Sequence, residues 1–204
     1  MITGVVNRND VCRLTKFCAS SYIKYCTYKV LFEGSDRHRR DYGRIAPFTL
    51  EDIATALKEH VILQVCKLAD PLGDHRGNEN LSIQFFIEHS DVGDQSIRLK
   101  SAGNRLAKFG TKLKPARDKI ISHFDRKTTY DGEPLGGAPD NEWERYWNDL
   151  KEFVDILALA YFKHTASIRS ATATMDAAIL RGVLERAAKS NLPLSLPTSP
   201  PEVD

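Results

Sequence analysis

The sequence lacks any closely paired cysteine motif, and the spacing of its four cysteines excludes two common uses of that residue. The four are Cys12, Cys18, Cys26 and Cys66, and no two of them form a CxxC pair. The first three fall within one expected helix, where they serve poorly as a disulfide framework or a zinc site. Free, buried thiols and a reducing, cytoplasmic location are therefore expected.

Long apolar runs and strand-like patterns are also missing. No apolar run approaches the roughly 18 to 20 residues that a membrane-spanning helix needs. Residues 1–10 are not followed by the apolar core of a signal peptide. No segment alternates apolar and polar residues convincingly, and no internal repeat is present. These absences argue against a membrane protein and against a sheet.

Net charge is small, so the total charge says nothing about nucleic-acid binding. Lys and Arg number 29 and Asp and Glu 27, a formal net charge of +2. The distribution is uneven. Between Arg98 and Lys127 there are ten basic and two acidic residues, which gives +8 and leaves −6 for the rest of the chain. The positive charge is therefore concentrated in one segment.

Apolar residues recur at steps of three and four through most of the chain, which predicts helices. Asn9 or Asp10 is expected to cap the first helix. Thr49 is expected to open the second, which ends before an Asp-Pro pair. A shorter helix should follow within residues 80–89, with Asn78 or Asn80 as its cap.

Three more helices are expected after these. The first begins near Asp94 and continues through Phe124, with a kink or restart at Pro115. The second is capped by Asp140, and the last covers residues 172–189. The sequence thus predicts an all-α, mostly antiparallel bundle of about five to six helices. One domain is expected over residues 1–190, followed by a proline-rich tail over 191–204.

The basic segment contains RDKIISHFD (residues 117–125), in which Arg117 is followed by His123. On a single helix turning about 100° per residue, these two lie roughly 120° apart and straddle an apolar seam. A long arginine side chain can bend across that gap. Their polar ends can therefore converge where the seam meets another helix or another subunit.

An arginine and a histidine so placed suit RNA cleavage without a metal. Attack of a ribose 2′-hydroxyl on its phosphate needs proton transfer near neutral pH, which an imidazole with a pKa near ~6.5 can supply. It also needs a cation at the phosphate oxygens, and arginine offers a planar fork of donors. Asp118 can orient the arginine. Four further cations lie alongside to attract the RNA backbone: Lys112, Lys114, Lys119 and Arg126.

These residues resemble HEPN domains, helical bundles in which an Arg and a His a few residues apart form a metal-independent RNase site. The run LADPLGDHRGNENLSI (residues 68–83), then a basic helix, then RDKIISHFD, is similar to HEPN-like proteins of the abortive-infection AbiU type. The resemblance covers residues 50–165. Its Asp-Pro turn followed by Glu-Asn-Leu-Ser makes it more specific than the Arg/His pair alone.

The resemblance implies an endoribonuclease toxin or phage-defence protein that works as a homodimer, with both Arg/His pairs facing one cleft. Arg117 would bind phosphate, His123 would act as acid and base, and Asp118 would stand beside the arginine. No cofactor is implied, and a cognate antitoxin is admitted as a partner. Members with nucleotidyltransferase antitoxins often have a tyrosine two residues after the histidine. That position is Asp125 here, so modification of a tyrosine is not implied.

A second interpretation stays open. In it the chain is a non-catalytic helical module that binds RNA or a protein partner. His123 would then edge the core, Arg117 would form an ion pair, and the basic residues would be a solvated face. A metal site is not expected, because Asp74-His75 and the His123/Asp125 pair have no third or fourth ligand spaced to join them.

Overall fold

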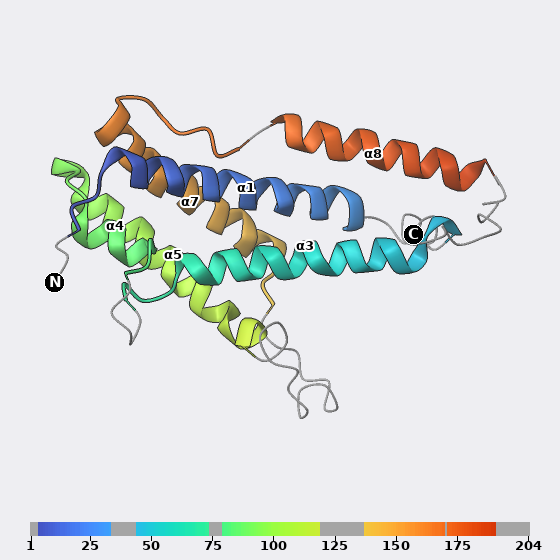
Figure 1. Cartoon of the computed structure of the whole chain (residues 1–204), viewed down its shortest axis with the longest axis horizontal. Coiled ribbons are helices and arrows are strands. Elements are labelled where there is room, and N and C mark those ends of the chain that lie inside the picture. Colours follow the sequence, from blue (N-terminus) through green and yellow to red (C-terminus); the bar gives the residue numbers. More distant parts are fainter. Residues whose placement is uncertain (1–3, 34–43, 74–78, 119–136, 170, 191–204) are drawn as a thin grey trace, which may run out of the picture. The chain divides into compact units, whose positions relative to one another are not determined.

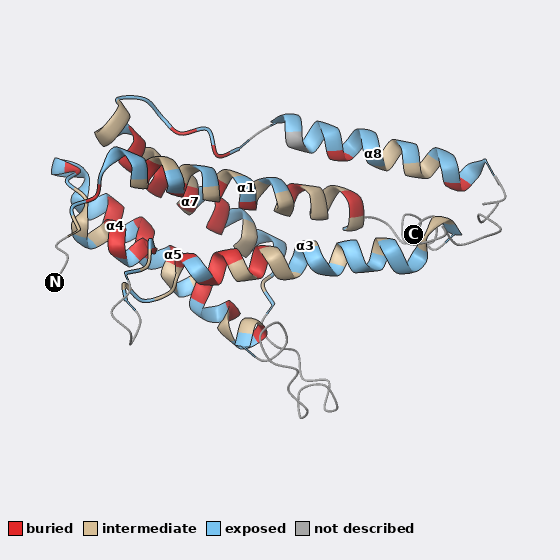
Figure 2. Cartoon of the chain, viewed as in Figure 1, coloured by how far each residue is buried: buried red, intermediate tan, exposed pale blue. Residues whose placement is uncertain are grey.

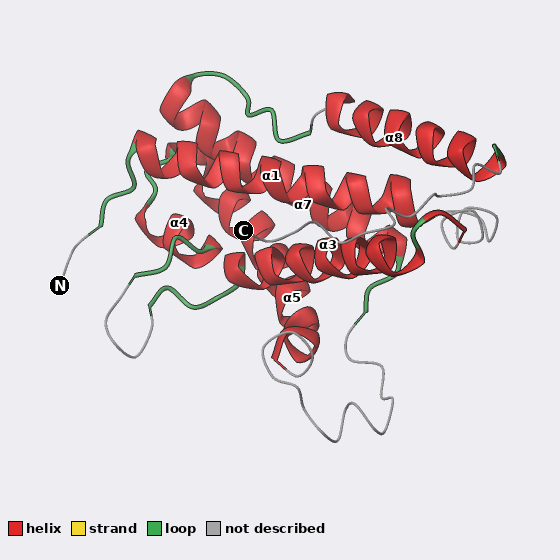
Figure 3. Ribbon diagram, turned by 45° about the vertical axis from the view of Figure 1, so that its right-hand side comes forward, coloured by secondary structure: helices red, strands yellow, loops and turns green. Residues whose placement is uncertain are grey.

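The computed structural model describes residues 4–33, 44–73, 79–118, 137–169 and 171–190. Within these ranges the chain forms six α-helices and no β-strand (Figures 1 and 3). The predicted all-α helical bundle is thus confirmed. The helices are α1 (Arg8–Phe32), α3 (Pro47–Leu68), α4 (Ile83–His89), α5 (Ser96–Ala116), α7 (Asp140–Phe162) and α8 (Ala171–Lys189).

The first helix begins earlier than the sequence indicated. Asn7 caps α1, because its side-chain Oδ1 accepts hydrogen bonds from the backbone N–H of Asn9 at 2.8 Å and of Asp10 at 3.1 Å. Asp10 Oδ2 in turn accepts from the N–H of Asn7 at 3.0 Å, which completes a capping box. The prediction that Asn9 or Asp10 caps this helix was therefore wrong, and Asp10 instead occupies the N3 position of the box.

The cap of α4 also differs from the prediction. Ser82 precedes this helix, and its Oγ accepts from the N–H of Phe85 at 3.5 Å. Asn78 lies outside the described residues. Asn80 is used otherwise: its Nδ2 donates to the carbonyl of Pro71 at 3.0 Å, and its N–H donates to that of Leu72 at 2.7 Å. Asn80 therefore ties the start of α4 to the turn that follows α3.

The remaining helices lie close to their expected places. α3 begins at Pro47, two residues before Thr49, which was expected to open it. Proline suits a first turn because it lacks an N–H, and an N–H there would have no helical partner. Pro139 occupies the N-cap position of α7, which begins at Asp140 itself, so the prediction that Asp140 caps this helix was wrong by one residue. α5 follows a short 3-10 turn, Gly93–Gln95, and contains Pro115 in its last turn. The predicted continuation through Phe124 lies outside the described residues.

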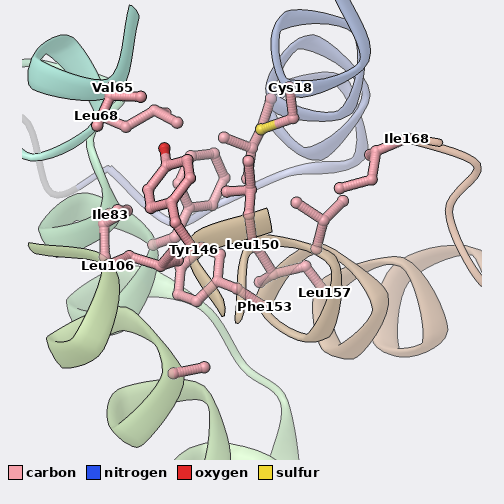
Figure 4. Close-up of a cluster of buried hydrophobic side chains, with 14 of the residues drawn as sticks. Cys18, Val65, Leu68, Ile83, Leu106, Tyr146, Leu150, Phe153, Leu157 and Ile168 are labelled. Carbon is pink, nitrogen blue, oxygen red and sulfur yellow. The ribbon is translucent and has the colours of Figure 1, made fainter. Parts of the chain in front are cut away.

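The main core belongs to one of two compact units, formed by Met1–Tyr25 and Leu57–Ser170. Figure 2 shows buried residues along α5, α7 and the C-terminal half of α3. α5 packs against both α4 and α7. Figure 4 shows apolar side chains from several helices converging there, each contributing roughly 1.5–3 kcal/mol when fully buried. They include Cys18, Val65, Leu68, Ile83, Leu106, Leu150, Phe153, Leu157 and Ile168.

An aromatic cluster joins α1 to α7 within this unit. The ring of Tyr25 stacks on Trp143 with centroids 5.5 Å apart, and Tyr22 meets Trp147 edge-on at 5.2 Å. Phe109 of α5 stacks on Tyr146 at 4.8 Å. Such pairs add to the energy of area burial. Trp147 is buried and Trp143 is partly buried against the same core, so both tryptophans belong to the packing of this unit.

The second compact unit consists of Cys26–Ala56 and Ala171–Asp204. Few of its described residues are buried, namely Leu31, Cys26 and two alanines of α8. The guanidinium Nη1 of Arg181 donates to the carbonyl of Val30 at 3.4 Å. The predicted single domain over residues 1–190 stays a prediction, and the tail over 191–204 lies outside the described residues. Among the helices that are described, none is long and apolar enough to cross a membrane.

Candidate functional site

Arg117 stands at the C-terminal end of α5. It is the C-cap of that helix, and its backbone N–H bonds to the carbonyls of Leu113 and Lys114. A cation is favoured here, because the last carbonyls of a helix carry partial negative charge. The Arg117 side chain is 22% exposed. It is therefore partly accessible, as a phosphate-binding residue must be.

Two carboxylates hold the Arg117 guanidinium. Nη1 donates to Asp70 Oδ1 at 2.7 Å, and Nε donates to Asp118 Oδ1 at 2.7 Å. Asp118 is the sequence neighbour expected to orient this arginine, whereas Asp70 comes from the residues just after α3. The two bonds fix the plane of the guanidinium, because each uses a different nitrogen of its rigid fork.

The hydrogen bond with Asp118 raises the pKa of Arg117 most, and the bond with Asp70 raises it further against the opposing effect of burial. The guanidinium is therefore always charged. Its third nitrogen, Nη2, has no hydrogen-bond acceptor within the described part of the chain. That leaves donor groups for an incoming anion.

A close approach of two helices places Asp70 beside Arg117. A Cβ built on Gly110 would lie 2.3 Å from the Cβ of Ala69 and 3.3 Å from the carbonyl oxygen of Val65. Only glycine at residue 110 allows α3 and α5 to come this near. Gly110 and Arg117 are two helical turns apart and so share one face of α5. Asp70, the residue after Ala69, lies within hydrogen-bond distance of Arg117.

Sequence reasoning missed Asp70 as a site residue. It used the Asp-Pro pair only as the end of a helix and as part of a family resemblance. An acid before a proline is an ordinary helix terminus, so no local pattern distinguishes it. A contact between residues 47 positions apart in sequence is visible only in the fold.

Three of the six basic residues of α5 are paired with acids of α7. Arg98 donates to Glu152 at 3.0 Å. Arg105 donates to both Asp149 at 2.8 Å and Glu152 at 2.9 Å. The hydrogen bond with Asp149 is the first cause of the raised pKa of Arg105. The excess positive charge of residues 98–127 is therefore partly compensated by residues far away in sequence.

Two of the four predicted RNA-binding cations lie in described parts of the chain. Lys112 Nζ donates to Glu142 Oε2 at 2.7 Å, so the charge of this lysine is compensated by that acid. Lys114 is half-buried near the end of α5 and has no acidic partner among the described residues. Lys119 and Arg126 lie outside the described residues, as does His123. The structure thus brings together Arg117, Asp118 and Asp70.

No group of three or more His, Cys, Asp or Glu side chains able to hold an ion occurs in the described ranges. Cys66 lies near the candidate site, with its Sγ 3.8 Å from the carbonyl oxygen of Gly110, and burial raises the pKa of its thiol to about 11. A protonated thiol is a poor nucleophile and a poor metal ligand.

A family model described as AbiU2, of the HEPN group, matches residues 10–179. No curated protein and no solved structure matches the chain.

Proposed function

Because the chain belongs to the AbiU2 family of HEPN domains, which is related to abortive infection, we propose that it is a metal-independent endoribonuclease of a toxin or phage-defence system. Arg117 binds the scissile phosphate in this proposal, and His123 moves the proton. The observation that carries it is the guanidinium of Arg117, oriented by Asp70 and Asp118 with Nη2 left for an anion.

The orientation matters for chemistry. Charge develops on the phosphate oxygens as the ribose 2′-hydroxyl attacks, and a donor already in place stabilises that charge without reorganisation. Asp70 and Asp118 supply such fixing, so both are positioning residues here. His123 takes the 2′-hydroxyl proton and returns a proton to the leaving 5′-oxygen. Lys112, Lys114, Lys119 and Arg126 attract the RNA backbone.

The proposal includes an assembly and a location. A symmetric homodimer, with residues 94–125 at or near the two-fold axis, would place two Arg/His pairs in one cleft. A cognate antitoxin would restrain the activity, and the protein would work in the cytoplasm.

A second candidate function has its own support. The Arg117 guanidinium already has two carboxylate partners, and Arg98, Arg105 and Lys112 are paired with acids of α7. A purely structural arginine and a compensated basic face fit a HEPN module that binds RNA or a protein partner without cleaving.

Cleavage of RNA in EDTA tests the choice between the two functions. We expect the wild type to cleave single-stranded RNA and leave 2′,3′-cyclic phosphate ends, while DNA, which lacks the 2′-hydroxyl, stays intact. His123→Ala should lose about 10²- to 10⁴-fold in rate with RNA affinity largely unchanged. Arg117→Lys should keep little of the cleavage activity, because the point charge of a lysine cannot reproduce the planar fork of donors that an arginine offers.

His164→Ala is the matched control, because this exposed histidine follows α7 and its Nδ1 lies beside the carbonyl of Thr165 at 3.1 Å. It should cleave like the wild type. Equal cleavage by wild type and His123→Ala would assign the activity to a contaminant or to another site. Absence of cleavage on every RNA tested would favour the binding module.

A further inference from the structure

A cavity of about 420 Å³ opens beside the candidate site. It lies within the unit that carries Arg117, between α1, the C-terminal end of α3 and the residues that lead into α4. Its volume falls in the range of roughly 300–1,000 Å³ typical of small-molecule sites. Asp70 lines this cavity and also bonds Arg117 at 2.7 Å. One carboxylate therefore separates the cavity from the guanidinium.

The walls of the cavity are apolar and partly aromatic. Leu14 and Leu68 are buried in the core behind it, while Phe17 is half-buried and Leu81 is 43% exposed at its edge. An aromatic ring among aliphatic side chains offers a stacking surface to a flat, apolar-faced group. Nucleic-acid bases are stacked in this way by proteins that bind single strands.

Two cations stand at the rim. Arg13 of α1 and Lys67 of α3 both line the cavity, both are exposed, and neither has an acidic partner among the described residues. They differ in this from Arg98, Arg105 and Lys112. Uncompensated cations around an apolar hollow suit a ligand that is anionic outside and apolar inside, which describes a nucleotide.

The other two polar residues that line the cavity, Asp70 and Asn80, offer acceptors. Asp70 Oδ1 is taken by Arg117, while Oδ2 has no donor within the described ranges. Asn80 is held by its Nδ2 on the carbonyl of Pro71 and by its backbone on Leu72, which leaves Oδ1 as its acceptor. An antiparallel bridge between Gly73 and Glu79 fixes the two segments together. Asp70 and Asn80 are therefore held in a constant relation.

We propose that this cavity binds a guanine base of the RNA, next to the phosphate held by Arg117. The proposal rests on the proposed function. Guanine presents two adjacent donors, N1–H and the N2 amino group, to acceptors such as Asp70 and Asn80. Uracil presents one donor between two carbonyl oxygens, which the acceptors repel. Arg13 and Lys67 bind the flanking phosphates, and Phe17 contacts the face of the base.

Mononucleotide binding tests the cavity independently of cleavage. Guanosine and uridine 5′-monophosphate are titrated into the full-length protein by calorimetry. We expect guanosine monophosphate to bind in the millimolar range or tighter, at least about fivefold better than uridine monophosphate. Leu81→Trp fills the cavity from its exposed edge and should weaken the binding of guanosine monophosphate by about tenfold. Ile97→Trp, at a position 83% exposed on α5, is the matched control and should bind as the wild type.

The rim is tested with charge variants. Arg13→Ala and Lys67→Ala should each weaken the binding of guanosine monophosphate severalfold. This loss of affinity should become smaller as salt is added. Lys16→Ala on α1 and Lys58→Ala on α3 remove exposed lysines that do not line the cavity, and they should change nothing.

The outcomes separate this proposal from the proposed function. Three outcomes would overturn the guanine site even if the protein cleaves RNA. They are nucleotide binding that is unchanged in Leu81→Trp, equal affinity for the two nucleotides, and no binding of either. Selective binding of guanosine monophosphate that is lost in Leu81→Trp would support the site. If no RNA is cleaved in that case, only the proposed catalytic role is refuted. If cleavage occurs, the wild type should prefer sites beside guanine and Leu81→Trp should lose that preference.

Discussion

Arg117 Nη1 lies 2.7 Å from Asp70 Oδ1, which joins the C-terminal ends of α5 and α3 although the two residues are 47 positions apart. The side chains are 22% and 29% exposed, so the pair is neither fully solvated nor fully buried. A pair in this position stabilises the fold modestly. It fixes the direction of the guanidinium more than it adds stability.

Asp70→Asn should therefore affect rate more than stability. The amide keeps the shape of the side chain but removes the charge that holds Arg117. We expect about a tenfold to hundredfold loss of RNA cleavage at saturating RNA, and about 1 kcal/mol lower free energy of unfolding. Single-turnover kinetics and urea unfolding measure the two effects. Asp94→Asn, at an exposed position before α5, is the control. An unchanged rate would show that Asp70 does not position the arginine.

Gly110→Ala should destabilise the protein, because the new Cβ would lie 2.3 Å from the Cβ of Ala69 and cannot be relieved by a rotamer change. We expect the free energy of unfolding to fall by about 1–3 kcal/mol. Gly182→Ala is the matched control within α8, where a Cβ meets only Arg186 Nη1 at 3.7 Å. It should stabilise by about 0.5–1 kcal/mol. Equal effects of the two substitutions would contradict the close helix crossing.

Lys114→Ala should weaken RNA binding more than Lys112→Ala, because Glu142 compensates the charge of Lys112. For Lys114→Ala we expect the slope of log affinity against log salt to fall by about one, as for one lost phosphate contact. Fluorescence anisotropy with a labelled RNA at several salt concentrations measures the slope. Lys100→Ala, an exposed lysine earlier on α5, is the control. A larger effect of Lys112→Ala would mean that RNA displaces Glu142.

Stability should decrease in alkaline solution. Burial raises the pKa of the Cys66 thiol to about 11 and raises that of Cys18 well above its ordinary value near ~8.5. Unfolding returns both to that value, so the unfolded chain loses protons above pH ~8.5 that the folded chain keeps. The stabilisation from protonated thiols is complete below that pH and is lost as pH rises toward the folded pKa values. Urea unfolding at pH 7 and pH 10 should show the decrease, and Cys66→Ala should make it smaller.

The proposed homodimer is tested by light scattering on the purified protein at micromolar concentration. We expect twice the mass of one chain, and cross-linking should map near residues 94–125. A monomer at every concentration, or a contact surface far from His123, would remove the composite cleft from the mechanism.

Local patterns predicted the helices well, because each needs only apolar spacing and a turn signal on either side. The caps were less accurate: Asn7 and Ser82 are as good N-cap residues as the neighbours that were chosen instead. Several polar residues able to cap a helix lie close together in the sequence. Which of them becomes the N-cap depends on where the chain enters the helix.

The candidate site was predictable only where its residues are neighbours in sequence. Arg117 was found from its spacing to His123, and Asp118 because it is the next residue in the sequence; the two side chains are bonded at 2.7 Å. Asp70 was missed because its role depends on the crossing at Gly110. The basic segment looked uncompensated because Asp149 and Glu152 lie on another helix. Charge counted along a sequence omits partners that folding brings near.

The aromatic cluster between α1 and α7 has an optical consequence. The chain has two tryptophans, Trp143 and Trp147, and both belong to this cluster. The unit formed by Cys26–Ala56 and Ala171–Asp204 contains none. Intrinsic tryptophan emission therefore reports the folding of the unit that carries Arg117, whereas far-ultraviolet circular dichroism reports every helix. Comparing the two signals during denaturation reveals whether the units melt together.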